Sequence, residues 1–212
     1  MPEIKDIRKE YRFTQLDIDS LDNNPIVQFK YWLNEAIKSG ADEPTAMVLS
    51  TATPDGKTSA RVVLLKEMDG DGFTFFTNYE SKKGQQLIAN PFGSLLFFWP
   101  RLERQVRIEG QLFKTPASTS DEYFNSRPEG SRIGAWASPQ SKRVPNREYL
   151  ESLQQDYLRM FSTKSMERPP HWGGYKLVPN LVEFWQGREN RLHDRLEYTR
   201  RGGLWEINRL AP

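Results

Sequence analysis

The stretch AMVLSTATPDGKTSARVVLLKEMDGDGFTFFT, residues 46–77, contains three β-like runs separated by turn signals. The runs are AMVLST (46–51), TSARVVLLK (58–66) and GFTFFT (72–77), and the turns are PDG at 54–56 and DGDG at 69–72. Apolar, β-branched and aromatic residues favour strands, and Asp-Gly pairs favour tight turns between them. The stretch therefore predicts an antiparallel meander.

Helices are predicted on either side of this meander. Asn24-Pro25 is a typical helix start and Ser39-Gly40 a typical stop, and the apolar residues between them recur at helical spacing: Ile26, Phe29, Leu33, Ala36 and Ile37. Ser81 is a typical N-cap for a short helix, KKGQQLIAN (82–90). Residues 118–136 favour short helices, and REYLESLQQDYLRMF (147–161) predicts an amphipathic helix with one apolar side: Tyr149, Leu150, Leu153, Tyr157, Met160 and Phe161.

Six further runs predict strands. They are GSLLFFWP (93–100), RQVRIEGQLFK (104–114), GGYKLVP (173–179), LVEFWQ (181–186), RLHDRLEYT (191–199) and LWEINRL (204–210), the last two joined by a Gly202-Gly203 hairpin signal. Antiparallel strands without βαβ alternation favour a closed barrel with appended helices, a mainly β fold of the α+β class. The polar residues 1–24 are predicted to form a flexible N-terminal arm, and residues 25–212 a single domain.

Composition limits the class of protein and the kind of site. The 30 Lys+Arg against 28 Asp+Glu give a net charge of +2, which does not by itself indicate a nucleic-acid surface. The absence of cysteine excludes disulfides and a cysteine nucleophile, and with only two histidines no metal site is expected. The charged N-terminus lacks the apolar region of a secretory signal, and no run approaches the length needed to span a bilayer. We expect a cytoplasmic protein without a membrane partner.

Several positive charges stand where an anionic ligand would explain them. Lys82 and Lys83 open a predicted helix, where the macrodipole and free backbone N–H groups favour a phosphate. Two lysines that simply reach into water would give the same pattern. Arg61 and Lys66 bracket four apolar residues and, as an odd and an even position, are expected to face opposite sides of a regular strand.

A second group of polar residues lies between positions 123 and 132. It suits a small phosphate ester, although each residue alone is typical of a protein surface: Tyr123, Arg127, Ser131 and Arg132. Near the end of the chain, Arg191, His193 and Arg195 stand at every second position, so a regular strand would align them on one face as a cationic ladder. Flanking arginines would also push His193 toward its neutral form. Trp185 nearby is typical of a buried strand residue.

The sequence resembles the pyridoxine (pyridoxamine) 5′-phosphate oxidase family. The family pattern E-[aromatic]-W-x₅-R-[apolar]-H-D-R is matched by Glu183-Phe184-Trp185 followed by Arg191-Leu192-His193-Asp194-Arg195. Further matches are RVVLLK at 61–66, SKKGQQL at 81–87, RPEGSRIGAWASPQS at 127–141 and the closing NRLAP. The resemblance therefore covers nearly all of the chain beyond the N-terminal arm.

The resemblance implies an FMN-binding split β-barrel that works as a homodimer, with the flavins bound across the subunit interface. It implies oxidation of the 4′ carbon of pyridoxine 5′-phosphate or pyridoxamine 5′-phosphate to give pyridoxal 5′-phosphate. In this reaction O₂ is the acceptor, H₂O₂ is a product, and the amine substrate also releases ammonia.

Matching motifs imply the residues of the site. The expected FMN phosphate grip is Arg61, Lys82 and Lys83, supported by Gln140 and Ser141. The expected flavin wall is Val62, Val63, Leu64, Leu65, Lys66, Phe76 and Thr77, and the other flavin contacts are Gln105, Trp185 and Arg195. The substrate phosphate is expected at Lys66, Tyr123, Arg127 and Ser131. The catalytic pair facing the substrate ring is expected to be Arg191, as the main positioning group, and His193. Arg8 and Tyr11 are expected to fold over the occupied site.

Two positions depart from the form expected in the family, since Phe76 stands where tyrosine is common and Lys82 where arginine is common. Each change would weaken one flavin contact. Two other functions stay open from the residues alone. One is a split-barrel protein that binds a flavin or a phosphate ligand without catalysis. The other is a nucleic-acid-binding module, which the near-neutral net charge and the scattered aromatics disfavour.

Overall fold

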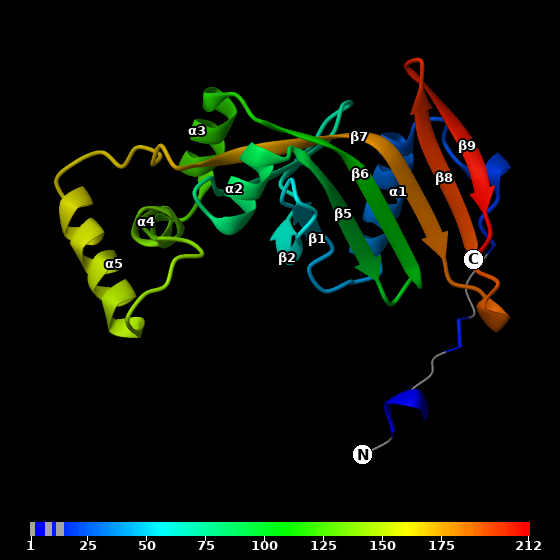
Figure 1. The fold of residues 1–212 in the computed structure, drawn as a ribbon, viewed down its shortest axis with the longest axis horizontal. Helices are drawn as coiled ribbons and strands as arrows, with labels where there is room; N and C mark the ends of the chain where they lie inside the picture. The colour runs from blue at the N-terminus through cyan, green and yellow to red at the C-terminus, as the bar shows by residue number, and fades with distance from the viewer. Residues whose placement is uncertain (1–2, 7–9, 12–14) are drawn as a thin grey trace.

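A computed structural model describes residues 3–6, 10–11 and 15–212 (Figure 1). In this part of the chain, nine strands form one antiparallel sheet. The strands are β1 (Ala46–Ala52), β2 (Thr58–Leu64), β3 (Glu67–Met68), β4 (Phe73–Asn78), β5 (Phe92–Trp99), β6 (Arg104–Lys114), β7 (Trp172–Gln186), β8 (Asp194–Arg201) and β9 (Leu204–Leu210). The helices are α1 (Pro25–Lys38), α2 (Lys82–Ala89), α3 (Ala117–Ser126), α4 (Glu129–Ala137) and α5 (Arg147–Phe161), with short 3-10 turns at Ile4–Asp6, Ile18–Ser20 and Glu189–Arg191. The predicted class, mainly β with appended helices, is confirmed.

The sheet is curled, and one segment of chain joins its two ends. The strand order is β2-β1-β5-β6-β7-β4-β3, so the end strands β2 and β3 are consecutive in sequence. The backbone N–H of Leu65 donates to the carbonyl of Thr45 beside β1, whereas the N–H of Lys66 donates to Thr74 of β4. The segment therefore changes its pairing partner between residues 65 and 66, which curls the sheet without a ladder between its two end strands.

The long strand β7 divides the sheet in two. One edge of β7 pairs with β6, while its other edge pairs first with β4 and then, from Leu181 onward, with β8. We expected two strands here, at 173–179 and 181–186, and the structure has one strand with a bulge. Gly110 of β6 faces Pro179, and the neighbouring Glu109 faces Leu181, so Asn180 is the extra residue. Pro179 has no N–H to give to a ladder, and a bulge allows the strand to continue past it.

Local signals account for the boundaries of the helices. The side chain of Asn24 caps α1 by accepting from the N–H of Ile26, and Ser81 caps α2 by accepting from Gly84. Gly202 and Gly203 both adopt positive φ, as the two-residue hairpin between β8 and β9 requires. None of the helices in the described ranges is both long enough and apolar enough to cross a membrane.

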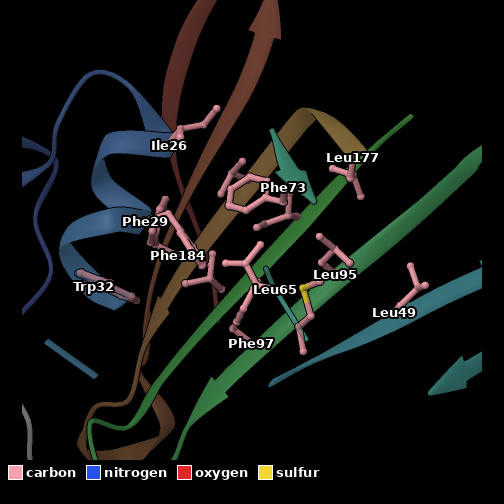
Figure 2. Packing of buried hydrophobic residues seen from close by; sticks show 14 of the residues in the cluster. Ile26, Phe29, Trp32, Leu49, Leu65, Phe73, Leu95, Phe97, Leu177 and Phe184 are labelled. Carbon is pink, nitrogen blue, oxygen red and sulfur yellow. The ribbon is translucent and has the colours of Figure 1, made fainter. Parts of the chain in front are cut away.

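Helix α1 packs against the concave side of the curled sheet (Figure 2). Phe29 is fully buried, with ring centroids 4.9 Å from Phe73 and 4.8 Å from Phe97. Trp32, which the predicted periodicity did not include, is also buried and meets Phe184 edge to face at 5.0 Å. Ile37 was expected on the buried side but is 52% exposed, because the buried stripe runs through positions 29, 32 and 36 and leaves Ile37 at its margin.

One other expectation about burial was wrong. Leu16 belongs to the segment predicted as an arm outside the core, yet it lies in the main hydrophobic cluster. Helix α5 spans Arg147–Phe161 as predicted; none of its residues is buried in the described chain, and Tyr149 and Met160 are exposed. In the described chain α5 packs mainly on α4, where Trp136 meets Tyr157 and Phe161.

Phe29→Ala should lower the free energy of unfolding by about 3–5 kcal/mol, because it removes a fully buried ring and leaves a cavity between α1 and the sheet. Urea unfolding at one fixed protein and ligand concentration measures this loss. Lys30→Ala on the exposed side of the same helix is the matched control and should change stability by less than about 0.5 kcal/mol. Equal losses in the two variants would contradict the packing described here.

Candidate functional site

A cavity of about 540 Å³ lies where β2 and β4 meet α2, α3 and α4. Its lining is Arg61, Val62, Val63, Leu64, Lys66, Phe76, Thr77, Lys83, Tyr123, Arg127, Pro128, Ser131, Gln140 and Trp172. Four of these side chains are cationic, and no acidic residue is among those that the structure describes around the cavity. A concentration of positive charge without carboxylates favours an anionic ligand.

Lys83 is the buried cation at the start of α2. Its Nζ donates to Gln140 Oε1 at 2.6 Å, to Thr77 Oγ1 at 3.0 Å and to Ser81 Oγ at 3.2 Å. Burial, helped by the nearby charge of Arg61, lowers the pKa of Lys83 to about 8. All three partners are neutral, so the ammonium group is hydrogen-bonded but its charge is not compensated.

Arg61 lies on β2 and is held from the neighbouring strand β1. Its Nη1 donates to the carbonyl of Leu49 at 3.0 Å and to Thr51 Oγ1 at 2.7 Å, and its Nη2 donates to Ser59 Oγ at 2.9 Å. Burial lowers the pKa of Arg61 from its usual value. Like Lys83, Arg61 is therefore oriented by neutral acceptors only.

Stacked aromatic rings form another wall of the cavity. Phe76 and Tyr123 are nearly parallel with centroids 4.0 Å apart, and the ring of Trp172 is nearly parallel to both, with centroids 5.6 Å and 6.1 Å away. The guanidinium of Arg127 lies over Trp172 at 4.7 Å, and its Nη1 is buried without a hydrogen-bond partner among the described residues. Burial lowers the pKa of Arg127. An unpartnered buried donor beside Ser131 is suited to a ligand oxygen.

Lys66 reaches the same cavity as Arg61, contrary to the expectation of opposite faces. That expectation assumed a regular strand through position 66, but β2 ends at Leu64 and the backbone changes partner at Leu65 and Lys66. The alternation of side chains is interrupted at that point. The two cations consequently line one cavity.

A second group of predicted residues lies across β6, β7 and β8. Gln105, Trp185 and Arg195 are direct neighbours on these three strands. The guanidinium of Arg195 donates from Nε to Glu183 Oε1 at 2.8 Å and from Nη1 to the carbonyl of Ala211 at 2.8 Å. Glu183 is buried and also accepts from Arg107 at 2.6 Å, and these two guanidinium groups keep its pKa low against the effect of burial.

The prediction that Arg191, His193 and Arg195 align on one face of a strand is wrong. Glu189–Arg191 form a 3-10 turn, Asn190 and Arg191 both have positive φ, and β8 begins only at Asp194. Arg191 and His193 therefore project from a loop, whereas Arg195 lies on the strand. Positive φ in an arginine is uncommon and costs on the order of 1 kcal/mol, and such strained residues cluster at functional sites.

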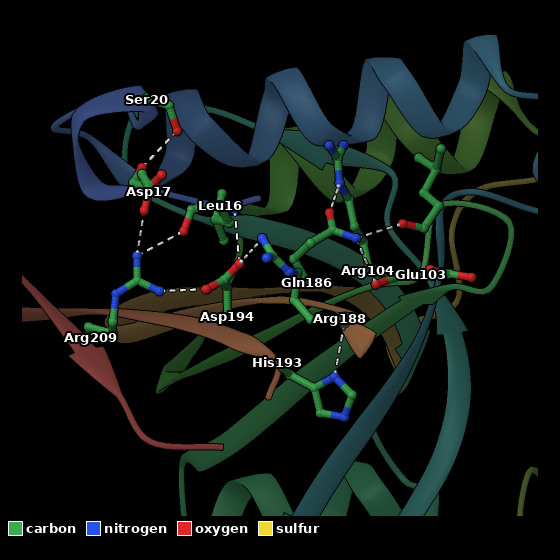
Figure 3. Close-up of polar contacts among 11 residues, drawn as sticks. Leu16, Asp17, Ser20, Glu103, Arg104, Gln186, Arg188, His193, Asp194 and Arg209 are labelled. Carbon is green, nitrogen blue, oxygen red and sulfur yellow. Dashed lines mark hydrogen bonds and ion pairs between the residues drawn. The ribbon is translucent and has the colours of Figure 1, made fainter. Parts of the chain in front are cut away.

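His193 is held in its neutral form by its surroundings. Its Nδ1 accepts from the backbone N–H of Arg188 at 3.1 Å, which leaves the proton on Nε2 (Figure 3). Burial lowers the pKa of His193, and the charge of Arg191 lowers it further. The predicted direction is confirmed, with Arg191 as one cause; Arg195 is neutralised by Glu183 instead. Trp185 is half-buried, with its ring 4.6 Å from that of His193.

Asp194 anchors this loop to the beginning of the chain and to β9 (Figure 3). Its carboxylate accepts from the N–H of Leu16 at 3.1 Å, from Arg188 at 3.4 Å and from Arg209 at 2.6 Å. Tyr11 packs edge to face on both Trp185 and His193, each with centroids 5.6 Å apart. Arg8, also predicted at the site, lies outside the described residues.

The two groups of residues lie at opposite ends of one strand. Trp172, at the start of β7, lines the cavity, whereas Trp185, near its end, lies beside His193. Thirteen residues of extended chain separate them, which is on the order of 40 Å. Figure 1 shows β7 running from the side of α2 and α3 to the side of β8 and β9. The groups at these two ends, here called the cavity half-site and the loop half-site, cannot contact one small ligand within a single chain.

Three predicted residues lie apart from both groups of contacts. Leu65 is part of the hydrophobic core, Lys82 is exposed at the start of α2, and Ser141, with φ of 69°, does not line the cavity. Sequence reasoning missed Trp172, the ring beneath Arg127. The Gly173-Gly174 pair that follows Trp172 is the local sign of close packing there, because a Cβ on Gly174 would lie 2.5 Å from Thr115 Oγ1 and 3.0 Å from the ring of Phe76.

Two family models and full-length relatives that match this chain all carry descriptions of pyridoxine or pyridoxamine 5′-phosphate oxidases. Residues 33–153 match the model described as pyridoxamine 5′-phosphate oxidase, and residues 172–212 match that of the pyridoxine 5′-phosphate oxidase C-terminal dimerisation region. A pyridoxine/pyridoxamine 5′-phosphate oxidase of Paraburkholderia phymatum is 54% identical over 213 residues, covering 100% of both chains. One from a Cyanothece species is 52% identical over 209 residues, covering 99% of this chain and 98% of the relative.

Solved structures share the fold. The structure of PhzG from Burkholderia lata, in complex with tetrahydrophenazine-1-carboxylic acid, has a TM-score of 0.89 at 32% identity and covers 96% of this chain and 100% of its own. An FMN-binding protein from Nostoc punctiforme, described as related to pyridoxamine 5′-phosphate oxidase, has a TM-score of 0.70 at 18% identity, covering 91% and 99%. The predicted split-barrel fold is thereby confirmed. With two family models spanning most of its length and relatives above 50% identity, the chain belongs to the pyridoxamine 5′-phosphate oxidase family.

Proposed function

We propose that the protein is an FMN-dependent oxidase that converts pyridoxine 5′-phosphate or pyridoxamine 5′-phosphate into pyridoxal 5′-phosphate. O₂ is reduced to H₂O₂, and the amine substrate also releases ammonia. The names of relatives at 52–54% identity support this assignment. The working unit is a homodimer with FMN at the subunit interface, in keeping with the dimerisation region matched at 172–212.

The observation that carries the proposal is that one cavity unites two sets of phosphate-binding groups. Arg61 and Lys83 lie with Thr77 and Gln140 in one set, and Lys66 and Arg127 lie with Tyr123 and Ser131 in the other. A protein that only binds a flavin needs one phosphate site. Two sets in one cavity favour a phosphorylated coenzyme beside a phosphorylated substrate.

The first set fits the phosphate of FMN. Lys83 is buried and Arg61 half-buried, both are held by neutral partners, and they are close enough for the charge of Arg61 to affect the pKa of Lys83. Val62 to Leu64 on β2 and Phe76 on β4 supply the apolar wall along the isoalloxazine. When bound, FMN supplies the two-electron acceptor that O₂ regenerates. The chain itself has to bind, orient and exclude water.

The second set fits the substrate phosphate. Arg127 offers a guanidinium whose Nη1 has no partner among the described residues, on the flat surface of Trp172. Lys66, Tyr123 and Ser131 line the same cavity, and they add an ammonium group and two hydroxyl groups. A guanidinium binds a phosphate through two parallel hydrogen bonds, which fixes orientation as well as affinity.

The loop half-site completes the site from the second subunit. Arg191 and His193 lie about 40 Å along β7 from the cavity of their own chain, so they serve the cavity of the partner. Neutral His193 donates a hydrogen bond from Nε2 at the substrate ring, and exposed Arg191 positions that ring. Arg195, fixed by Glu183, faces the flavin and stabilises negative charge on its reduced form.

The purified protein should be yellow, and its flavin absorbance should bleach when pyridoxine 5′-phosphate is added without oxygen and return on admission of air. The expected reason is electron transfer from the bound substrate to FMN. Unphosphorylated pyridoxine is the matched control and should bleach the protein far more slowly, since it lacks the group held by Lys66 and Arg127. A protein that binds FMN but does not bleach would be a flavin-binding protein without oxidase activity, and one that takes up no FMN would defeat the assignment altogether.

Arg127→Ala and Arg191→Ala should each lower kcat/KM on the order of 100-fold, because each removes a charge that positions an anionic substrate. Co-refolding the two inactive variants in equal amounts should restore about a quarter of the wild-type activity. Random pairing makes about half of the dimers mixed, and one of the two sites in each mixed dimer is then intact. Steady-state assays of the mixture and of each variant alone measure this. Absence of recovery would place both arginines in one chain's site, and an Arg191→Ala variant with wild-type kcat/KM would overturn the role of Arg191.

FMN should bind more weakly as pH rises from about 7 to about 9.5. The pKa of Lys83 is lowered to about 8, so its positive charge is present below that pH and lost above it, whereas the FMN phosphate, with its second pKa near 6, stays dianionic throughout. Bound phosphate favours the charged lysine and moves the midpoint upward. Flavin fluorescence titrations at several pH values measure this dependence.

The control for this pH dependence is Lys83→Arg, which keeps its charge over the whole range and should flatten the profile. Riboflavin, which lacks the phosphate, should show no comparable weakening with the wild-type protein. A wild-type FMN profile as flat as that of the arginine variant would contradict the role of Lys83.

A further inference from the structure

Gln86, on the second turn of α2, lies buried behind Arg61. Its Oε1 is 2.7 Å from Thr51 Oγ1 and 2.7 Å from Ser59 Oγ. The same two hydroxyl oxygens are the acceptors of Arg61 Nη1 and Nη2. Gln86, Thr51 and Ser59 thus form a connected set, called here the Gln86 relay, between α2 and the guanidinium of Arg61.

The direction of every hydrogen bond in the Gln86 relay is determined by chemistry. A guanidinium only donates, and the Oε1 of an amide only accepts. Each hydroxyl has a single proton, so Thr51 and Ser59 must give theirs to Gln86 and turn lone pairs toward Arg61. Without the amide oxygen, both hydroxyl groups would be free to rotate their protons toward the guanidinium.

The relay leaves one edge of Arg61 open. Of the five N–H donors, both on Nη1 are used by Leu49 and Thr51, and one on Nη2 is used by Ser59. The remaining two, on Nε and Nη2, have no partner among the residues that the structure describes and flank one edge of the guanidinium. Such a pair of donors matches two oxygens of a phosphate.

The relay also holds Arg61 without neutralising it. A carboxylate in place of Gln86 would orient Arg61 as well, but it would cancel the charge that an anionic ligand needs. Gln86 is three residues after Lys83 on α2, so the two side chains share one face of the helix. Through Lys83 directly and through Gln86 indirectly, α2 sets the position of both cations.

We propose that Gln86 is a positioning residue for FMN, acting through Thr51 and Ser59 to present the open edge of Arg61 to the flavin phosphate. This inference rests on the proposed role of Arg61 as a phosphate ligand. Gln86 does not itself line the cavity. Its contribution is confined to the phosphate end of the cofactor.

Binding of FMN and of riboflavin to the full-length apoprotein dimer tests the proposal, because the two ligands differ only in the phosphate. Gln86→Leu should weaken FMN about 10-fold and leave riboflavin within about twofold, as measured by quenching of flavin fluorescence. Thr51→Val, which removes the hydroxyl at nearly constant volume, should act in the same way. Thr51→Ser, which keeps the hydroxyl, should retain the affinity of the wild type.

The outcomes separate this inference from the proposed function. Arg61→Ala is the reference, and if it kept the wild-type preference for FMN over riboflavin, the phosphate grip itself would be wrong. If Arg61→Ala lost that preference while Gln86→Leu and Thr51→Val kept it, the grip would stand and the relay would be refuted. Equal weakening of both flavins in the relay variants, or equal behaviour of Thr51→Val and Thr51→Ser, would reduce Gln86 to a packing residue.

Discussion

The arrangement of the whole cavity depends on one change of strand partner. The segment from Thr58 to Met68 pairs first with β1 and then with β4, and the change falls between Leu65 and Lys66. This joins the ends of the sheet and curls it around Phe29 of α1. It also breaks the alternation of side chains, so that Lys66 enters the cavity already lined by Arg61. A flat continuation of β2 would have kept these two charges on opposite faces. The curl that encloses the core is therefore also what assembles the anion site.

Bringing like charges together has a cost, and the two half-sites deal with it differently. In the cavity, burial lowers the pKa of Arg61, Lys83 and Arg127, whose described contacts are hydroxyl, carbonyl and amide oxygens or an aromatic face. At the other end of β7, the buried carboxylate of Glu183 neutralises Arg195. Uncompensated charge destabilises the empty cavity and is relieved when an anion binds, whereas a neutralised arginine gains little from a second anion. This contrast favours phosphates, with their localised charge, in the cavity and, beside Arg195, a ring whose negative charge is delocalised.

The sequence was sufficient for features with a local cause. The caps of α1 and α2, the glycine hairpin at 202–203 and the span of α5 all follow from residues next to one another. Features with a distant cause were not predictable in the same way. The left-handed backbone conformation of Arg191 depends on a loop that Asp194 ties to Leu16 and Arg209. The alignment of Arg61 depends on Gln86, which lies 25 positions away in another element. The family motif pointed to several of these residues, but it did not reveal the contacts by which they are held.

The length of β7 is the reason why the proposed site requires two chains. A strand with Trp172 at the cavity and Trp185 at the loop keeps the half-sites apart, and no hinge in a hydrogen-bonded strand can bring them together. Each half-site also has an exposed apolar side chain whose contact with water is unfavourable: Val62 at the cavity, and Leu192 beside Arg191. Burying such residues against a second copy offsets the entropy of association, and a bound cofactor adds to the same free energy because it contacts both chains. Assembly of the dimer and retention of the flavin are then coupled, because in the proposed site the cavity of each subunit is completed by the loop of the other.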